Sequence, residues 1–185
     1  MLRKLVAVAV FLAAPVPHIA RAQEPESWQA KVAHALPLLG HRNWILIVDS
    51  AYPLQRSPGI ETIDTHAPPT LVLRVVLTGI ENSEHLRPDI YTDAELPFVT
   101  DQDAPGISQF RVNLADMLRA YPVQSQAHGK LIDRVDQDSH MFQVLVLKTN
   151  STLPYSSVFI HLKAKYWSDE AESRLRTKMS SGTQP

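Results

Sequence analysis

Two short, uninterrupted apolar runs constrain the fold of this chain most. Residues 44–48 read Trp-Ile-Leu-Ile-Val, and residues 144–147 read Val-Leu-Val-Leu. Neither run alternates with polar residues, which is typical of strands that helices cover on both faces of a sheet. Each run ends at a charged residue, Asp49 or Lys148. Together with the helices between them, the runs predict a three-layer α/β/α domain with a mostly parallel sheet.

The other segments supply the helices and further strands of such a domain. Ser27 can cap a first helix, which Pro37 should kink or end early. Residues 71–80 contain many β-branched side chains, but the spacing of their apolar residues favours a helix over a strand. The predicted helices are 28–39, 71–80, 108–120 and 128–136, and the predicted strands are 44–48, 88–91, 144–147 and 158–164.

Three segments carry more specific expectations. Residues 60–69 are polar and contain two prolines, so we expect a loop. Residues 158–164 alternate between apolar and polar side chains, which suits the edge of a sheet or a contact between subunits. The tail from Ser168 onward is polar and charged, and we expect a frayed helix or disorder there.

The first 22 residues have the pattern of a secretory signal. Basic residues at positions 3 and 4 precede an apolar run over 5–16, and residues 20–22 read Ala-Arg-Ala, with cleavage expected before Gln23. The run is too short for a membrane anchor, which needs about 20 apolar residues. The predicted organisation is a signal peptide at 1–22, one domain at 23–167 and a tail at 168–185, in a periplasmic or secreted protein without a membrane anchor after cleavage.

Composition excludes several classes of function. The chain has no cysteine, so thiolate catalysis and Cys-based metal sites are ruled out. Cleavage would remove three of the 18 basic residues and none of the 19 acidic ones, which leaves a net charge of −4 and argues against a nucleic-acid partner. Phosphate-binding glycine motifs, a GxSxG elbow and His spacings typical of metal sites are also absent from the sequence. We therefore expect neither a metal nor a cofactor.

Polar residues flank the buried strands where chemistry is expected. Asp49 follows the 44–48 strand at its carboxyl end, where ligands of open α/β sheets bind. His41 precedes the same strand, about 25 Å away at the usual rise of a strand. The two meet only if the His41 turn folds over or a neighbouring subunit supplies one of them. The loop at 148–157 is rich in hydroxyl and amide groups that suit sugar hydroxyls.

Two ordered motifs resemble the D-ribose pyranase and L-fucose mutarotase (RbsD/FucU) family. The first is Gly40-His41, an apolar strand, Asp49 and then Pro53. The second is Val-Leu-Lys-Thr at 146–149 followed by Pro-Tyr at 154–155 and another apolar strand. The motifs cover about a third of the chain that follows the signal, and residues 60–125 contain nothing that matches.

The resemblance implies a ring-shaped homo-oligomer with active sites between neighbouring subunits and a monosaccharide as partner. By position in the motifs, His41 matches the acid/base of the family, Asp49 its supporting carboxylate, and Tyr155 the tyrosine that contacts the sugar. His128, at the start of a predicted helix, is the candidate for a second histidine. Ser157 stands where the family has a sugar-binding asparagine, and Asn43 stands where an acidic residue is common.

The implied function is cofactor-free interconversion of the ring forms of a sugar. Two alternatives remain open: a non-catalytic oligomer that binds a sugar or sugar acid, and a structural oligomer with a degenerate site. Each candidate residue also has an ordinary role. These are a turn histidine for His41, a loop cap for Asp49, a solvated helix residue for His128 and a core aromatic for Tyr155.

Overall fold

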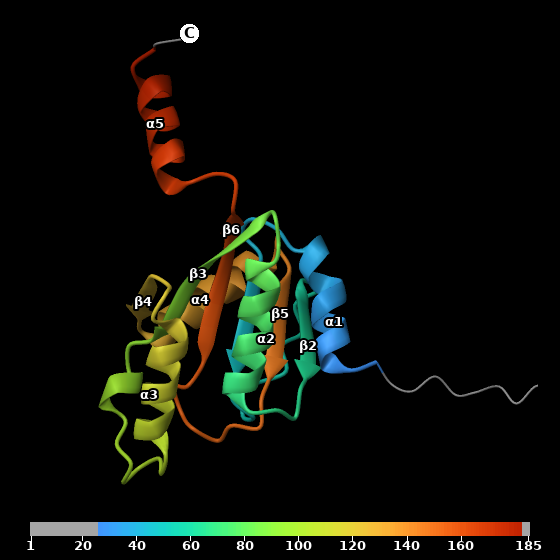
Figure 1. Cartoon of the computed structure of the whole chain (residues 1–185), viewed down its shortest axis with the longest axis vertical. Helices are drawn as coiled ribbons and strands as arrows, with labels where there is room; N and C mark the ends of the chain where they lie inside the picture. The colour runs from blue at the N-terminus through green and yellow to red at the C-terminus, as the bar shows by residue number, and fades with distance from the viewer. Residues whose placement is uncertain (1–25, 183–185) are drawn as a thin grey trace, which may run out of the picture.

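The computed structural model describes residues 26–182 (Figure 1). The predicted signal peptide lies outside these residues. The helices are α1 (Trp28–Ala35), α2 (Pro69–Glu81), α3 (Ile107–Leu118), α4 (His128–Ser139) and α5 (Asp169–Ser180), with short 3-10 turns η1 (Leu36–Leu38) and η2 (Leu96–Phe98). The strands are β1 (Trp44–Val48), β2 (Ile60–Asp64), β3 (Leu86–Asp93), β4 (Val123–Gln126), β5 (Val144–Lys148) and β6 (Val158–Ala164).

The strands form one six-stranded mixed sheet in the order β2-β5-β1-β6-β3-β4. β1 pairs in parallel with β5, β5 with β2, and β3 with β4. Only β6 runs the other way, antiparallel to β1 on one side and β3 on the other. The predicted α/β class with a mostly parallel sheet is confirmed.

Helices cover both faces of this sheet, as the fully apolar β1 and β5 require. In β1, Ile45 and Ile47 pack into a core with residues of α1, α2 and α3, whereas Trp44, Leu46 and Val48 face the residues of α4. Figure 1 shows α2 and α3 in front of the sheet and α4 behind it. The three-layer prediction is therefore confirmed, with three helices on one face and one on the other.

Two sequence expectations about strands are wrong. Residues 60–64 form β2 rather than a loop; β2 pairs only with β5, so an edge position lets its polar side chains face solvent. β6 lies inside the sheet, so the expected edge position is wrong, and the alternative, a contact between subunits, stays a prediction. Its alternation arises because its apolar side chains enter one core, while the other face carries a buried polar network described below.

The C-terminal tail forms a helix that projects from the domain and contacts it through its first residue, Asp169. Ser168 caps α5 by accepting a hydrogen bond from the Ala171 N–H, and acidic residues fill the first turn, where the helix dipole favours them. None of the residues of α5 is buried, and Figure 1 shows it projecting beyond the end of β6. Between residues 26 and 182, no helix is long and apolar enough to cross a membrane.

Candidate functional site

The predicted site residues lie at two opposite ends of the sheet. Asp49 follows β1 and shares a cavity of about 470 Å³ with His128. His41 precedes β1 and lines a separate cavity of about 450 Å³. A single chain thus brings Asp49 and His128 together and keeps His41 apart from them, which is the separation expected from the length of β1.

At the carboxyl end of β1, Asp49 also performs its ordinary structural role. Its Oδ1 accepts a hydrogen bond from the Ala51 N–H at 2.7 Å, which shapes the loop after the strand. Tyr52 lies in the same cavity wall and is almost fully buried. Burial, reinforced by the negative charges of Asp49 and Asp93, raises the pKa of Tyr52 to about 12. Its phenol therefore stays protonated at neutral pH.

His128 is held in place by two carboxylates from the β3 end. Glu95 accepts the His128 backbone N–H with both oxygens, at 3.0 and 3.1 Å, and so caps the start of α4. Asp93 lies 3.0 Å from the imidazole, Oδ1 to Nδ1. This contact fixes the ring and makes Nε2 the nitrogen available for other partners.

Asp93 is a buried carboxylate with one unsatisfied oxygen. Its side chain has no exposed area, and its Oδ2 lacks a hydrogen-bond partner within the described chain. Burial raises the pKa of Asp93, the hydrogen bond from His128 opposes that rise, and the charges of Glu95 and Asp49 add to it. A buried, poorly satisfied carboxylate behind a histidine is costly for stability, and such groups concentrate at functional sites.

Of the two predicted sugar-contacting residues, only Tyr155 is accessible. Its ring meets the His128 ring edge-on at 5.7 Å between centroids, and its backbone has a left-handed φ of 53°. A tyrosine rarely adopts this conformation without a surrounding structure that holds it there. Ser157 is 1% exposed, so its hydroxyl is closed off from solvent in the single chain.

At the other end of the sheet, the His41 cavity is formed by the turn before β1, the ends of β3 and β6, and the first turns of α5. The residues that line it are His41, Arg42, Arg87, Lys163, Ala164, Tyr166, Trp167, Asp169, Glu172 and Arg176. The sequence motifs indicate only the first of these. The sequence does not predict the contribution of α5, because it indicates a frayed helix or disorder for the tail.

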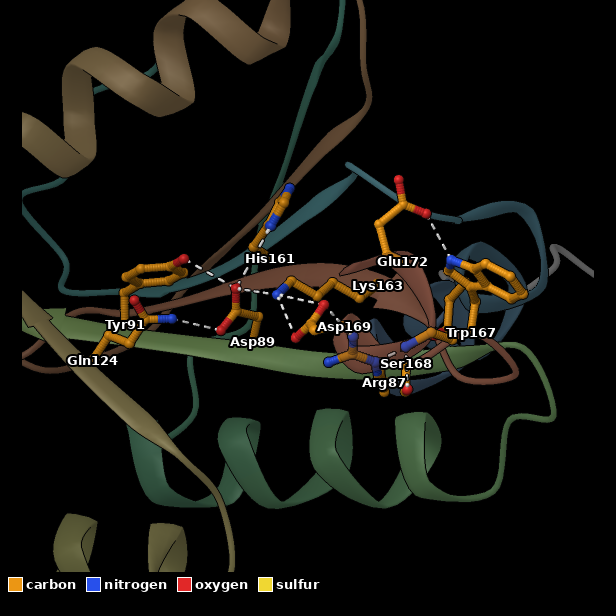
Figure 2. Close-up of polar contacts among 12 residues, drawn as sticks. Arg87, Asp89, Tyr91, Gln124, His161, Lys163, Trp167, Ser168, Asp169 and Glu172 are labelled. Carbon is orange, nitrogen blue, oxygen red and sulfur yellow. Dashed lines mark hydrogen bonds and ion pairs between the residues drawn. The ribbon is translucent and has the colours of Figure 1, made fainter. Parts of the chain in front are cut away.

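A polar network on the α4 side of the sheet leads toward this cavity (Figure 2). Its centre is Asp89 on β3, which accepts hydrogen bonds from Tyr91 at 3.0 Å and from Gln124 at 2.7 Å. Lys163 lies 3.3 Å from Asp89 and 3.3 Å from Asp169, so it connects the sheet to α5. The network explains the polar positions of β6.

His161 is the buried titratable group of this network. Its ring lies against Trp44, 4.5 Å between centroids, and its Nδ1 lacks a hydrogen-bond partner within the described chain. Burial and the nearby positive charge of Arg134 lower the pKa of His161 to about 4. His161 is therefore neutral at physiological pH.

The site offers groups that can transfer protons and form hydrogen bonds. Across residues 26–182, no group of three or more His, Cys, Asp and Glu side chains is arranged to hold a metal ion. Sequence reasoning missed Asp93 and His161. For Asp93, the available signal was its position at the carboxyl end of β3, beside β6, the strand that follows the Tyr155 loop.

Comparison with known proteins identifies the fold. No protein-family model matches the chain, and no curated protein sequence matches it. The structure matches Bacillus subtilis RbsD, solved with D-ribose, with a TM-score of 0.53 and 14% identity over 76% of this chain and 98% of that one. It also matches a fucose mutarotase from Streptococcus pneumoniae, solved with L-fucose, with a TM-score of 0.50 and 15% identity over 80% of this chain and 98% of that one.

The chain has the RbsD/FucU fold. The two matched structures are covered almost completely, whereas about a quarter to a fifth of this chain has no counterpart in them. The resemblance inferred from the two sequence motifs is thus confirmed at the level of the fold. The roles of His41, Asp49, His128, Tyr155 and Ser157 stay predictions.

Proposed function

We propose that this protein interconverts the ring forms of a monosaccharide by histidine acid/base catalysis without a cofactor. The observation that carries the proposal is the Asp93–His128 pair, which opens onto a cavity shared with Asp49 at the carboxyl ends of the parallel strands. Two proteins that share this fold were solved with monosaccharides. The same end of the sheet is where open α/β folds bind ligands.

The reaction needs only proton transfers. A base takes the proton of the anomeric hydroxyl while an acid protonates the ring oxygen; the ring C–O bond breaks, and an open-chain aldehyde forms. Reclosure on either face, or through another hydroxyl, reverses these transfers and returns both protons. With Asp93 ionised, His128 Nδ1 donates to it and Nε2 exchanges the substrate proton.

A second acid/base comes from His41 of a neighbouring copy. His41 and His128 lie in different cavities of one chain, so a homo-oligomer, ring-shaped as the family resemblance implies, would place the His41 end of one subunit against the Asp49–His128 end of the next. In that arrangement Asp49 supports the transfer and Tyr155 contacts the sugar. The predicted signal peptide adds the proposal that the protein acts in the periplasm or outside the cell.

Anomeric exchange measured by NMR magnetisation transfer tests the proposal. The purified protein is compared with His41→Ala on ribose, fucose, galactose, glucose and uronic acids. His34→Ala is the matched control, because the His34 side chain is 79% exposed on α1. We expect sugar-specific exchange that falls about 100-fold or more in His41→Ala and persists in the control. Exchange no faster than buffer across the panel would contradict catalysis.

A non-catalytic sugar- or sugar-acid-binding oligomer is the second candidate. It is favoured by Ser157, which replaces the asparagine of the family motif and is closed off from solvent. Such a protein would bind a sugar without accelerating its exchange. Thermal stabilisation by that sugar, about 2.7 kcal/mol at 100 times its dissociation constant, would then appear without catalysis.

A further inference from the structure

The His41 cavity has an excess of positive charge. Four cationic side chains and two carboxylates line it, and His41 itself adds a titratable ring. The carboxylates are Asp169 and Glu172, both on α5. A substrate that carries only hydroxyl groups does not require this excess of positive charge. Whether each cationic side chain already has a carboxylate partner therefore indicates which of them is available to a ligand.

The carboxylates of the cavity are already engaged. Asp169 lies 2.8 Å from Arg87 and 3.3 Å from Lys163, and these contacts lower the pKa of Asp169. Glu172 accepts a hydrogen bond from the Trp167 indole at 2.8 Å and pairs with Arg176 at 2.6 Å. The hydrogen bonds from Trp167 and Arg176 lower the pKa of Glu172, so both carboxylates are ionised and compensated at neutral pH.

Arg42 is the cation left without a carboxylate. It takes part in none of the salt bridges of residues 26–182, and its guanidinium lies over the Phe142 ring at 5.6 Å. It directly follows His41, and its φ of 75° is left-handed. The Arg42 N–H donates to the Leu162 carbonyl at 2.9 Å, which anchors this conformation to β6. Strained backbone of this kind concentrates at ligand sites.

An aromatic wall faces the same cavity. Trp167 is 43% exposed, and its indole N–H is committed to Glu172. One end of the side chain is therefore fixed while part of its ring remains accessible. Apolar ring carbons of a sugar pack well on such a surface, and a guanidinium binds a carboxylate through two parallel hydrogen bonds.

We propose that the His41 cavity selects a monosaccharide that carries a carboxylate, of the uronic acid class. Arg42 binds the carboxylate, and Trp167, supplied by the segment that leads into α5, supports the ring. The proposal rests on the proposed function, because it places the sugar of that reaction at His41. The two matched structures were solved with ribose and fucose, which carry no carboxylate, so a preference for an acidic sugar goes beyond what they indicate.

Galacturonate and galactose form a matched pair for the test, because they differ only at C6, which is a carboxylate in galacturonate and a hydroxymethyl group in galactose. Binding of each to the full-length protein is measured by calorimetry, and anomeric exchange by NMR. We expect galacturonate to bind about 10- to 100-fold more tightly, the range of a charge-assisted hydrogen-bonded pair. In Arg42→Gln the preference should disappear, and in Arg42→Lys, which keeps the charge, part of it should remain.

Arg119→Gln is the control, because Arg119 lies at the C-cap of α3, is exposed and pairs with Asp116. Equal binding of the two sugars by the wild type, or an unchanged preference in Arg42→Gln, would overturn the proposal. Anomeric exchange of neutral sugars, without preferential binding of galacturonate over galactose, would overturn this proposal and leave the proposed function standing. Galacturonate binding that depends on Arg42, without exchange of any sugar, would support it and contradict catalysis.

Discussion

At the scale of a single residue, Asp93 is a buried carboxylate whose ionised form lowers the stability of the fold. Its carboxylate is fully buried, and one of its oxygens is unsatisfied. Because burial raises its pKa, the ionised form is less favourable in the folded protein than in the unfolded chain. The free energy of unfolding therefore decreases as the pH rises from the pKa of Asp93 in the unfolded chain through its pKa in the folded protein. Its Oδ1 lies 3.0 Å from His128 Nδ1, and the proposed mechanism relies on this contact.

Asp93→Asn should separate these two roles. The amide keeps the shape and removes the buried charge, so we expect unchanged stability or a gain on the order of 1 kcal/mol. Exchange should fall about 10- to 100-fold, because the amide no longer stabilises a charged imidazole. Thermal unfolding and NMR exchange at pH 7 measure the two effects. Asp116→Asn, on the surface of α3, is the control. A parallel loss of stability and activity would assign Asp93 a structural role alone.

His161 predicts a dependence of stability on pH. Its pKa is lowered to about 4 in the folded protein, against 6.5 for an unperturbed histidine. Between these values the unfolded chain binds a proton that the folded chain does not, so stability falls as the pH is lowered through this window. The largest loss of stability that His161 causes at low pH is about 3 kcal/mol.

His161→Gln should flatten the slope of Tm against pH between about 6.5 and 4. Its unfolding is compared with that of His34→Gln, whose exposed side chain should leave the slope unchanged. Differential scanning calorimetry at several pH values gives both slopes. An identical slope in wild type and His161→Gln would show that another group causes the acid sensitivity.

Among individual residues, the sequence singles out candidates only where a motif or a helix start marks them, and the roles of these candidates stay predictions. His41 and Asp49 flank an apolar strand, and His128 begins an amphipathic helix, so all three stood out in the sequence. Asp93 and His161 did not, because each is an ordinary polar residue in a strand until its partners are known. Those partners, His128 and Trp44, are distant in sequence and are brought close only by the assembled sheet.

At the scale of elements, sequence patterns found the elements that pack deeply and missed those at the edges. α2, α3 and α4 bury regular apolar positions, and β1 and β5 are apolar throughout. β2 and β4 lie at the two edges of the sheet. Their exposed side chains carry little hydrophobic periodicity, so pairing with a neighbouring strand decides their structure.

α5 gives the prediction that belongs to this scale. A stop codon in place of Ser168 removes the whole helix, none of whose residues is buried, so we expect a change in unfolding free energy below about 1 kcal/mol. The same truncation removes Asp169, Glu172 and Arg176 from the His41 cavity. Arg42 and Trp167 remain, but Glu172, which holds the Trp167 indole, is lost. We therefore expect calorimetry to show weaker binding of both galacturonate and galactose, with the preference for galacturonate retained. Wild-type affinity in the truncated protein would show that α5 is not part of the site.

At the scale of the whole molecule, the layer architecture was predictable and the shape of the site was not. Buried strands that alternate with amphipathic helices leave few arrangements besides a covered, mostly parallel sheet. The site depends instead on what lies at each end of that sheet. Asp49 follows β1 at one end of the sheet, and His41 precedes β1 at the opposite end. The cavities that these two residues line remain separate in one chain. An active site that needs both histidines must form between copies.

Complementation between two inactive variants tests this composite site most directly. His41→Ala and His128→Ala are each purified alone and also co-expressed as mixed oligomers, and anomeric exchange is measured on the preferred sugar. If each site joins two subunits, random mixing restores about a quarter of the sites with both histidines intact, and activity returns to about that fraction of the wild type. Mixed oligomers as inactive as either variant alone would contradict a site shared between subunits.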